Sequence, residues 1–370
     1  MPSYSIWLGG WLLDGSYGDG PIRVPLGLGF DAVSGTEDVE TMQPKHSDSG
    51  WALRLRRWVV AYVVLIAWAV EIIFFKIIDP SYFFTIHNFR QIGNSQGPLL
   101  ILALSLVSTL CVGEIDLSIA ATMTMSAIIV AQYNGMDHWS LWPVLIIAMA
   151  VSMLIGLING LLTVYVGVQG IIVTLGMGTA LLGLAQEISH STSIGGVSAG
   201  LTNFMNKPIF GVDGEFYYSI IVAVLLWYVF RHTPLGRRIL FIGHNREAAR
   251  LSGVKVARLR LLAFVFGSTL AGFAGIVLVG VTGGLESSSL QPLLLPAFAA
   301  AFVGSTIFVP GQVNAFGTYV AVLFLETGIV GLELKGFANW VQNVFYGVAL
   351  VLAVVGSRLV AVRASKRSRV

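Results

Sequence analysis

Long apolar segments dominate this sequence and decide what it can fold into. A helix needs about 20 mostly apolar residues to cross a hydrocarbon core of roughly 30 Å. Ten segments approach or exceed that length: 58–77, 97–112, 117–132, 141–166, 171–188, 217–231, 260–281, 293–309, 314–332 and 338–356. Their apolar residues are continuous rather than alternating, which favours helices over a transmembrane barrel. The sequence therefore predicts an all-α, polytopic transmembrane helical bundle of about ten spans.

Charge composition excludes several classes of protein. Only 11 % of the residues are charged, against about 25 % in soluble domains. Too few charges remain to cover a soluble enzyme or to bind nucleic acid, so the expected partner is the lipid bilayer. The single cysteine excludes a disulfide scaffold and a cysteine-ligated zinc site.

The basic residues orient the predicted bundle. Sixteen Lys and Arg residues lie within 54–57, 231–260 and 358–369, whereas only four lie in the loops expected on the opposite side. Because cytoplasmic loops carry an excess of Lys and Arg, both termini are predicted to be cytoplasmic. An even number of spans requires the same arrangement.

The chain divides into three regions. Residues 1–50 carry seven of the 19 acidic residues and no sustained apolar period, which predicts a disordered N-terminal tail. The alternative is that the start codon is assigned too early and that translation begins at Met42. Residues 51–357 form the predicted transmembrane domain, and residues 358–370 form a basic cytoplasmic tail.

Acidic residues in or at the edge of predicted spans are costly in lipid. They are Glu71, Glu114, Asp116, Glu187 and Glu326. No Lys or Arg lies deep in a span, so these acids are expected to be protonated, to face water or to lie at the interface. Glu114 and Asp116 lie in a break between two apolar runs, and interrupted helices place polar groups in transport pathways. Asp116 could equally cap the helix that begins at Leu117 and Ser118, and the two roles can coexist.

The 231–260 loop carries eight basic residues. Asn245 can cap a short helix over 246–251, and Gly253 suits the left-handed position after it. Such a helix either docks into a groove on another protein or lies on anionic lipid, and physical arguments leave both open. Elsewhere, glycines inside apolar runs are expected to allow close helix packing; they are Gly156, Gly160, Gly272 and Gly275. No GxxxxGK[ST] motif and no catalytic constellation occurs.

Several motifs resemble those of one transporter family. Residues 113–119 (GEIDLSI) are similar to a GGIDLSVG segment, and residues 156–160 (GLING) with 172–176 (IVTLG) are similar to a GxxNG…FIxTLG stretch. Residues 232–254 (HTPLGRRILFIGHNREAARLSGV) resemble a TxxGRxxxAIGGNxEAAxLSGI loop. Over residues 51–357 the chain thus resembles the permease subunits of ribose/xylose/arabinose-type ABC sugar importers.

The resemblance implies a translocation subunit of the bacterial inner membrane that is not itself an enzyme. It implies a cytoplasmic ABC ATPase, which would hold the ATP and Mg²⁺, a periplasmic sugar-binding protein and a second permease copy, with no cofactor on this chain. It also makes the short helix a coupling helix. The implied ATPase-coupling residues are Gly243, Asn245, Glu247, Ala248, Ala249, Arg250, Ser252 and Gly253.

The predicted cargo is a monosaccharide or a similar small polyol. Such solutes need hydrogen-bonding partners, and the polar residues expected to line the pathway are Glu114, Asp116, Ser118, Asn159, Gln169, Thr174 and Asn314. A second apolar break at 310–314 suggests a duplicated five-span unit. Glu114 departs from the family pattern, which has glycine there. The alternatives are an ion-coupled secondary transporter that uses Glu71 or Glu326, and an ABC permease for another cargo such as a nucleoside.

Overall fold

A computed structural model describes residues 50–78, 83, 85, 88, 90, 92, 93, 96–286, 289–309, 311–338 and 340–367, with backbone alone for 50–61 and 357–367. Gly50 already belongs to the first helix. The rest of the predicted tail, and the choice between Met1 and Met42 as the start, lie outside the described residues.

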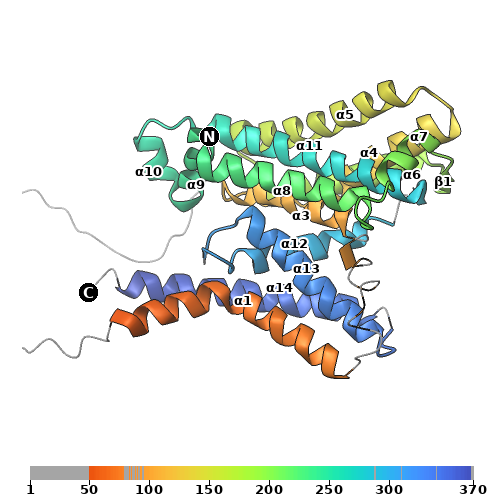
Figure 1. Cartoon of the computed structure of the whole chain (residues 1–370). Coiled ribbons are helices and arrows are strands. Elements are labelled where there is room, and N and C mark those ends of the chain that lie inside the picture. The colour runs from red at the N-terminus through yellow and green to blue at the C-terminus, as the bar shows by residue number, and fades with distance from the viewer. Residues whose placement is uncertain are drawn as a thin grey trace, which may run out of the picture. The chain divides into compact units, whose positions relative to one another are not determined.

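Helices form almost all of the described chain (Figure 1). The first half contains α1 (Gly50–Ile78), α3 (Gly97–Leu110), α4 (Ile119–Val130), α5 (Leu141–Leu161), α6 (Gly170–Ile188), α7 (Ala199–Met205) and α8 (Gly214–His232). The second half contains α9 (Pro234–His244), α10 (Arg246–Leu251), α11 (Val256–Thr282), α12 (Leu294–Gly304), α13 (Ala315–Glu333) and α14 (Trp340–Arg367). Short turns of π-helix, Ala131–Met136 and Leu162–Val166, extend α4 and α5, and a 3₁₀ turn, Gln291–Leu293, precedes α12.

Each of the ten predicted segments coincides with a helix of the described chain. Within the described residues, five helical segments are long and apolar enough to cross a membrane: Leu141–Val166, Gly170–Ile188, Gly214–His232, Val256–Thr282 and Ala315–Glu333. Three shorter apolar helices are Gly97–Leu110, Gln291–Gly304 and Trp340–Gly356. The prediction of a helical membrane protein is thus confirmed. Helix α14 extends to Arg367, and so includes residues 358–367 of the predicted basic tail.

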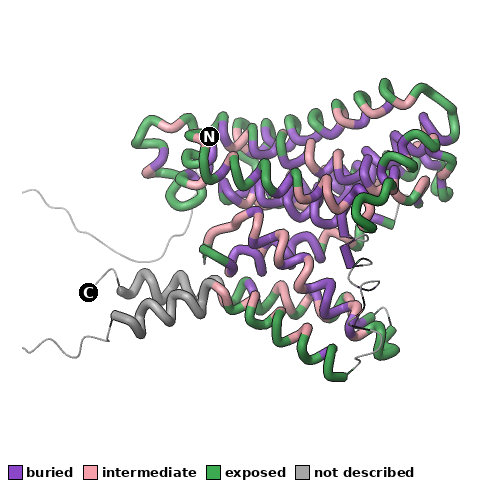
Figure 2. The backbone as a smooth tube through the Cα atoms, viewed as in Figure 1, coloured by how far each residue is buried: buried purple, intermediate pink, exposed green. Residues whose placement is uncertain are grey.

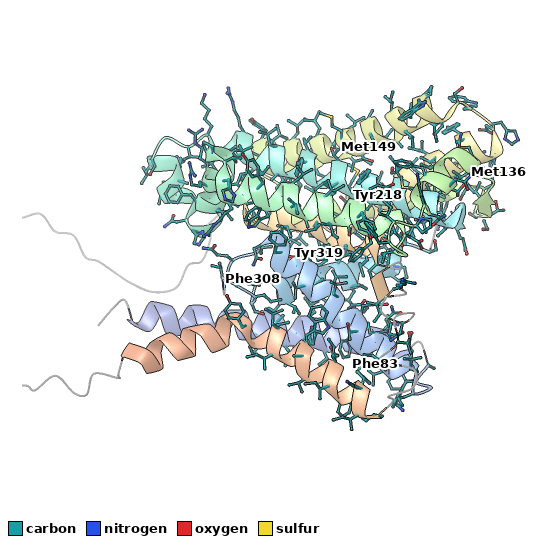
Figure 3. The ribbon with its side chains drawn as sticks, viewed as in Figure 1. Phe83, Met136, Met149, Tyr218, Phe308 and Tyr319 are labelled. Atoms are coloured by element: carbon teal, nitrogen blue, oxygen red, sulfur yellow. The ribbon has the colours of Figure 1, made fainter. Side chains whose placement is uncertain are left out.

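Helix α11 is the central packing element. It contacts α3, α4 and α5 along its length, and Figure 2 shows these helices buried on the sides that meet. Helix α12 packs on α3, α13 and α14, and α13 packs on α1. Tyr319 of α13 (Figure 3) contacts α8, because its hydroxyl lies 3.4 Å from Ser219 Oγ.

Glycines allow α11 to approach its neighbours closely. A Cβ atom on Gly156 of α5 would lie 2.5 Å from the Phe264 carbonyl oxygen of α11. A Cβ atom on Gly275 of α11 would collide with the Met123 carbonyl oxygen of α4. A Cβ atom on Gly160 would lie 2.5 Å from Leu261 Cδ1, and a Cβ atom on Gly272 would collide with the Ser152 side chain. The prediction that these four glycines permit close packing is confirmed, in agreement with the small residues found between membrane helices.

The two ends of the bundle differ in structure. Helices α9 and α10 lie at one end, and α7 lies with the strands at the other (Figure 1). Strands β1 (Ser193–Gly195) and β2 (Gly284–Glu286) pair antiparallel, with Ile194 opposite Leu285. Neither the strands nor α7 and α9 were expected from the sequence, since all four are short and lie between apolar segments.

Candidate functional site

The first helix break, residues 111–118, turns the chain between α3 and α4. Gly113 takes the left-handed conformation, with φ of 75°, which costs glycine little. One carboxylate oxygen of Asp116, Oδ1, accepts hydrogen bonds from the Ser118 backbone nitrogen at 2.9 Å and from Ser118 Oγ at 2.6 Å. Asp116 therefore forms an Asx turn onto Ser118, which is itself the N-cap residue of α4. The expected N-cap by Asp116 is not found, because no side chain caps the first backbone nitrogens of α4 in the described chain.

Polar side chains join this break to α5 and α6. Asn159 Nδ2 of α5 donates to Ser118 Oγ at 2.9 Å. The Leu117 backbone nitrogen donates to Thr174 Oγ1 of α6 at 3.0 Å. Asp116, Ser118, Asn159 and Thr174 are all fully buried. Four of the seven predicted pathway residues therefore form one cluster, in which Asp116 Oδ2 and Asn159 Oδ1 have no hydrogen-bond partner among the residues that the structure describes.

Glu114 differs from the expectation for an acid in a break. Its Oε1 accepts hydrogen bonds from Arg246 Nη2 at 2.7 Å and from Arg260 Nε at 2.8 Å, and it also forms an ion pair with Arg260 Nη2 at 2.6 Å. Glu114 is thus ion-paired with two arginines. The sequence did not indicate these partners, because both arginines lie more than 130 positions from Glu114, in the 231–260 loop and at the start of α11.

The second break, residues 305–314, separates α12 from α13. Asn314 Oδ1 accepts from the Gly317 backbone nitrogen at 2.6 Å and so caps α13. Asn314 Nδ2 donates to the carbonyl oxygens of Gly304, Ile307 and Gln312. Each break thus has an Asx side chain that fixes the start of the next helix, Asp116 before α4 and Asn314 before α13.

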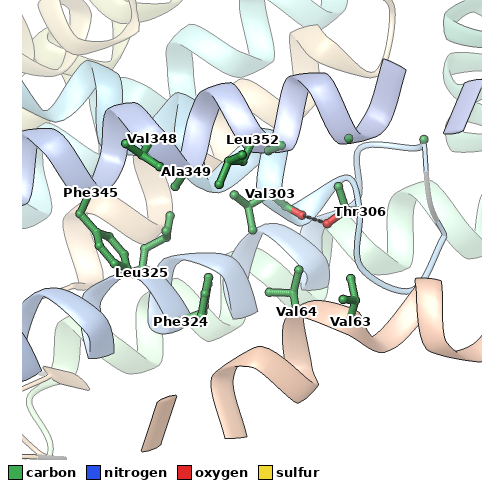
Figure 4. Close-up of a pocket in the computed structure, with 13 residues that line it drawn as sticks. Val63, Val64, Val303, Thr306, Phe324, Leu325, Phe345, Val348, Ala349 and Leu352 are labelled. Carbon is green, nitrogen blue, oxygen red and sulfur yellow. Dashed lines mark hydrogen bonds between the residues drawn. The ribbon is translucent and has the colours of Figure 1, made fainter. Parts of the chain in front are cut away.

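Two cavities adjoin the second break. One of about 480 Å³ lies among α1, α12, α13 and α14 and has almost entirely apolar walls (Figure 4). Its Thr306 hydroxyl is already bound to the Val303 carbonyl oxygen. The other, also of about 480 Å³, is lined by Asn314, Gln312 and Arg231 among apolar residues. Only this second cavity offers several polar groups to a hydrophilic solute. Gln169 is exposed just before α6 and does not belong to the buried cluster.

The coupling segment, defined here as residues 233–253, contains α9 and α10. Thr233 Oγ1 accepts from the Gly236 nitrogen at 3.1 Å, and Pro234 begins α9. Asn245 Oδ1 accepts from the Ala248 nitrogen at 2.9 Å, which confirms the predicted cap and short helix. Gly253 has the left-handed φ of 79° that the sequence predicted.

Residues of α10 divide into an outer and an inner set. Glu247 and Arg250 are exposed and form an ion pair of 2.6 Å with each other, and this hydrogen bond raises the pKa of Arg250 above its usual value. Gly243, Asn245, Ser252 and Gly253 are also exposed, and Ala248 is half-buried. Ala249 is fully buried and packs into the bundle, so its side chain faces away from any partner. Leu251, which the sequence analysis did not select, is 78 % exposed.

The coupling segment contacts both breaks. A Cβ atom on Gly243 would collide with the Cys111 carbonyl oxygen of the first break. His244 Nδ1 lies 2.7 Å from the Leu240 carbonyl oxygen and therefore donates to it, which leaves Nε2 to accept from Gln312 Nε2 of the second break at 2.7 Å. The breaks also meet directly, because Cys111 Sγ donates to the Val313 carbonyl oxygen at 3.6 Å. No motif or spacing in the sequence indicated the roles of His244, Gln312, Arg246 and Arg260.

Comparison with known proteins places these features in a family. Residues 90–354 match the family described as branched-chain amino acid transport system / permease component. The chain belongs to this family. The prediction of a multi-pass permease in the inner membrane is confirmed, and its relatives are transport permeases rather than enzymes.

Known relatives cover most of the chain. The D-allose transport system permease protein AlsC of Escherichia coli K12 is 29 % identical over 294 residues, which are 79 % of this chain and 90 % of that protein. The autoinducer 2 import system permease protein LsrD of Photorhabdus temperata is 30 % identical over 312 residues, 81 % and 90 % of the two chains. LsrD of Yersinia pseudotuberculosis YPIII is 29 % identical over 318 residues, 83 % and 91 %. No solved structure matches the chain.

Proposed function

We propose that the chain is the translocation subunit of an ATP-driven importer for a monosaccharide or a similar small polyol. The observation that carries this proposal is the capped helix α10, presented at one end of a helical permease whose relatives import D-allose or autoinducer 2. In this proposal the ten helices that coincide with apolar segments are ten spans, and both termini are cytoplasmic. Residues 51–357 are then the permease domain between two tails.

The proposed transporter has four components. A cytoplasmic ABC ATPase binds ATP and Mg²⁺ and docks on the coupling segment, where Glu247, Arg250 and Leu251 are exposed. A periplasmic sugar-binding protein delivers solute at the opposite end, and a second permease copy completes the pore. The chain itself binds no cofactor. An Asx side chain binds a backbone nitrogen at the end of each break, Asp116 before α4 and Asn314 before α13, which supports the proposed five-span repeat.

The solute pathway is proposed to pass the two breaks. Asp116, Ser118, Asn159 and Thr174 hold the first break in place, and Asn314 lines a polar cavity at the second. Asp116→Asn separates the structural role of the Asx turn from a pathway role, because an amide oxygen can still accept from Ser118. Reduced uptake with an unchanged unfolding temperature would support the pathway role. Unchanged uptake would leave Asp116 with the structural role alone.

Co-purification tests the partner. The tagged chain is isolated from mild-detergent membranes beside the double variant Glu247→Ala/Arg250→Ala, with Glu187→Gln as a control on the exposed end of α6. Wild type and control are expected to recover a P-loop ATPase that the double variant loses. Recovery of the chain alone from every sample would favour an ion-coupled carrier. Glu71 and Glu326 would then be the acids to mutate, since Glu71 lines a cavity between α1 and α13 and Glu326 accepts from the Tyr346 hydroxyl.

The cargo is tested by uptake into cells that contain the assembled transporter. Labelled D-allose and autoinducer 2 are the first probes because they are the cargoes named in the relatives. Competition by other monosaccharides, by ribonucleosides and by branched-chain amino acids then defines the class. Competition by nucleosides or amino acids alone would reject the polyol proposal.

A further inference from the structure

We infer that Glu114 is a positioning residue that transmits movement of α10 to the first helix break. This inference rests on the proposed function, because it requires an ATPase that moves α10. Glu114 neither contacts ATP nor needs to contact the solute. Its role is to keep the break, the coupling helix and α11 in one charged cluster while they move.

The geometry of the cluster ties three elements to one carboxylate oxygen. Arg246 Nη2 of α10 and Arg260 Nε of α11 donate to Glu114 Oε1 at 2.7 and 2.8 Å. Arg260 Nη2 lies 2.6 Å from the same oxygen in an ion pair. Arg246 Nη2 also lies 3.3 Å from the Val112 carbonyl oxygen, to which it donates. The coupling helix therefore binds both the side chain and the backbone of the break.

Burial makes this connection stronger than an ordinary surface ion pair. The Glu114 side chain is 9 % exposed and that of Arg260 is 15 % exposed, whereas Arg246 is 46 % exposed. Charges that are shielded from water interact more strongly, and a charge that loses its partner there is penalised. Without the carboxylate, two guanidinium groups would face each other at the break. We therefore expect loss of the Glu114 charge to push α10 and α11 away from the break.

Arg246 is placed so that any movement of α10 also moves its guanidinium group. It is the first residue of the helix, directly after the Asn245 cap. A rigid movement of α10 therefore carries the guanidinium with it. The break passes this movement on, because Leu117 and Ser118 are hydrogen-bonded to α6 and α5.

Two further contacts join the coupling segment to the breaks. His244, at the end of α9, accepts from Gln312 of the second break, and Gly243 packs on Cys111 of the first. Residues 243–246 thus contact both breaks within four consecutive positions. Of these contacts, the Glu114 cluster alone involves charge, and it is the one that an isosteric substitution can remove.

The test measures coupling rather than activity alone. The complete transporter, with its ATPase, is reconstituted in proteoliposomes with Glu114→Gln, and uptake and ATP hydrolysis are measured in the same vesicles. Uptake per ATP hydrolysed is expected to fall roughly fivefold or more, in the usual range of coupling effects, while hydrolysis stays within about twofold of wild type. Glu187→Gln, the same change on the exposed end of α6, is expected to keep the wild-type ratio.

A double-mutant cycle tests the route through Arg246. Arg246→Gln alone is expected to lower the ratio, and Glu114→Gln/Arg246→Gln is expected to lower it no further than Glu114→Gln, since both changes remove one interaction. An unchanged ratio in Glu114→Gln, additive effects in the cycle, or an equal loss of uptake, hydrolysis and thermal stability would overturn the inference. Failure of wild type and of Glu187→Gln to show ATP-dependent uptake would instead reject the proposed function.

Discussion

Gly156→Ala tests whether close approach of α5 and α11 stabilises the bundle. The added Cβ would lie 2.5 Å from the Phe264 carbonyl oxygen and 2.8 Å from both Val265 Cα and Ser268 Cβ. Ordinary Cβ contacts begin at 3.4 Å, so α5 and α11 must separate by about 0.9 Å locally. A gap of about 0.5–1 Å forfeits a quarter to a half of each affected dispersion contact. The alternative, strain without separation, costs about 1–3 kcal/mol.

Gly176→Ala is the matched control. Gly176 lies on an exposed face of α6, and a Cβ there would have no heavy atom within 4 Å. Both variants gain the helix propensity of alanine, about 1 kcal/mol. The difference between them therefore isolates the packing cost of about 1–3 kcal/mol.

Thermal unfolding of the purified chain in one detergent measures that difference. Each kcal/mol corresponds to a shift of roughly 2–4 °C for a domain of similar size, so Gly156→Ala is expected to unfold several degrees below Gly176→Ala. Equal midpoints for the two variants would refute the argument that α5 and α11 are in backbone contact at this glycine.

Three further substitutions test the caps and the buried cluster. Asn245→Ala removes the acceptor for the Ala248 nitrogen, and the loss of about 1 kcal/mol is expected to reduce co-purified ATPase roughly fivefold at unchanged expression of the chain; equal recovery would contradict this. Asn314→Ala removes the cap at Gly317, so hydrogen exchange in the first turn of α13 should accelerate roughly fivefold, and unchanged exchange would argue against the cap. Thr174→Val leaves the Leu117 nitrogen without its acceptor and should destabilise the chain by about 1–3 kcal/mol, measured by thermal unfolding against wild type.

The sequence predicted the helices well because its strongest signals are local. Apolar length identifies a helix in lipid whatever its neighbours are, and all ten predicted segments coincide with helices. Caps are also local, since the side chain binds a backbone nitrogen two or three positions ahead. This explains why the α10 cap at Asn245 could be predicted from the residues alone.

Side-chain orientation was less predictable. Ala249 was selected for the coupling surface together with Glu247, Ala248 and Ser252, but its side chain packs inward. Leu251 is the large apolar side chain that α10 exposes instead. A helix of six residues makes fewer than two turns, so its apolar pattern is too short to indicate which side faces the bundle.

What the sequence alone determined is the class of molecule: a helical membrane permease whose apolar segments are interrupted at two breaks. Only the tertiary structure decided what those breaks contact. Glu114 forms ion pairs with Arg246 and Arg260, which lie 132 and 146 residues away in the sequence. Gln312 forms a hydrogen bond with His244, which lies 68 residues away. Hydrophobic length and capping act within a few residues of each position, whereas an ion pair depends on where packing brings distant helices together. The connection between the coupling helix and the breaks therefore became visible only in the folded chain.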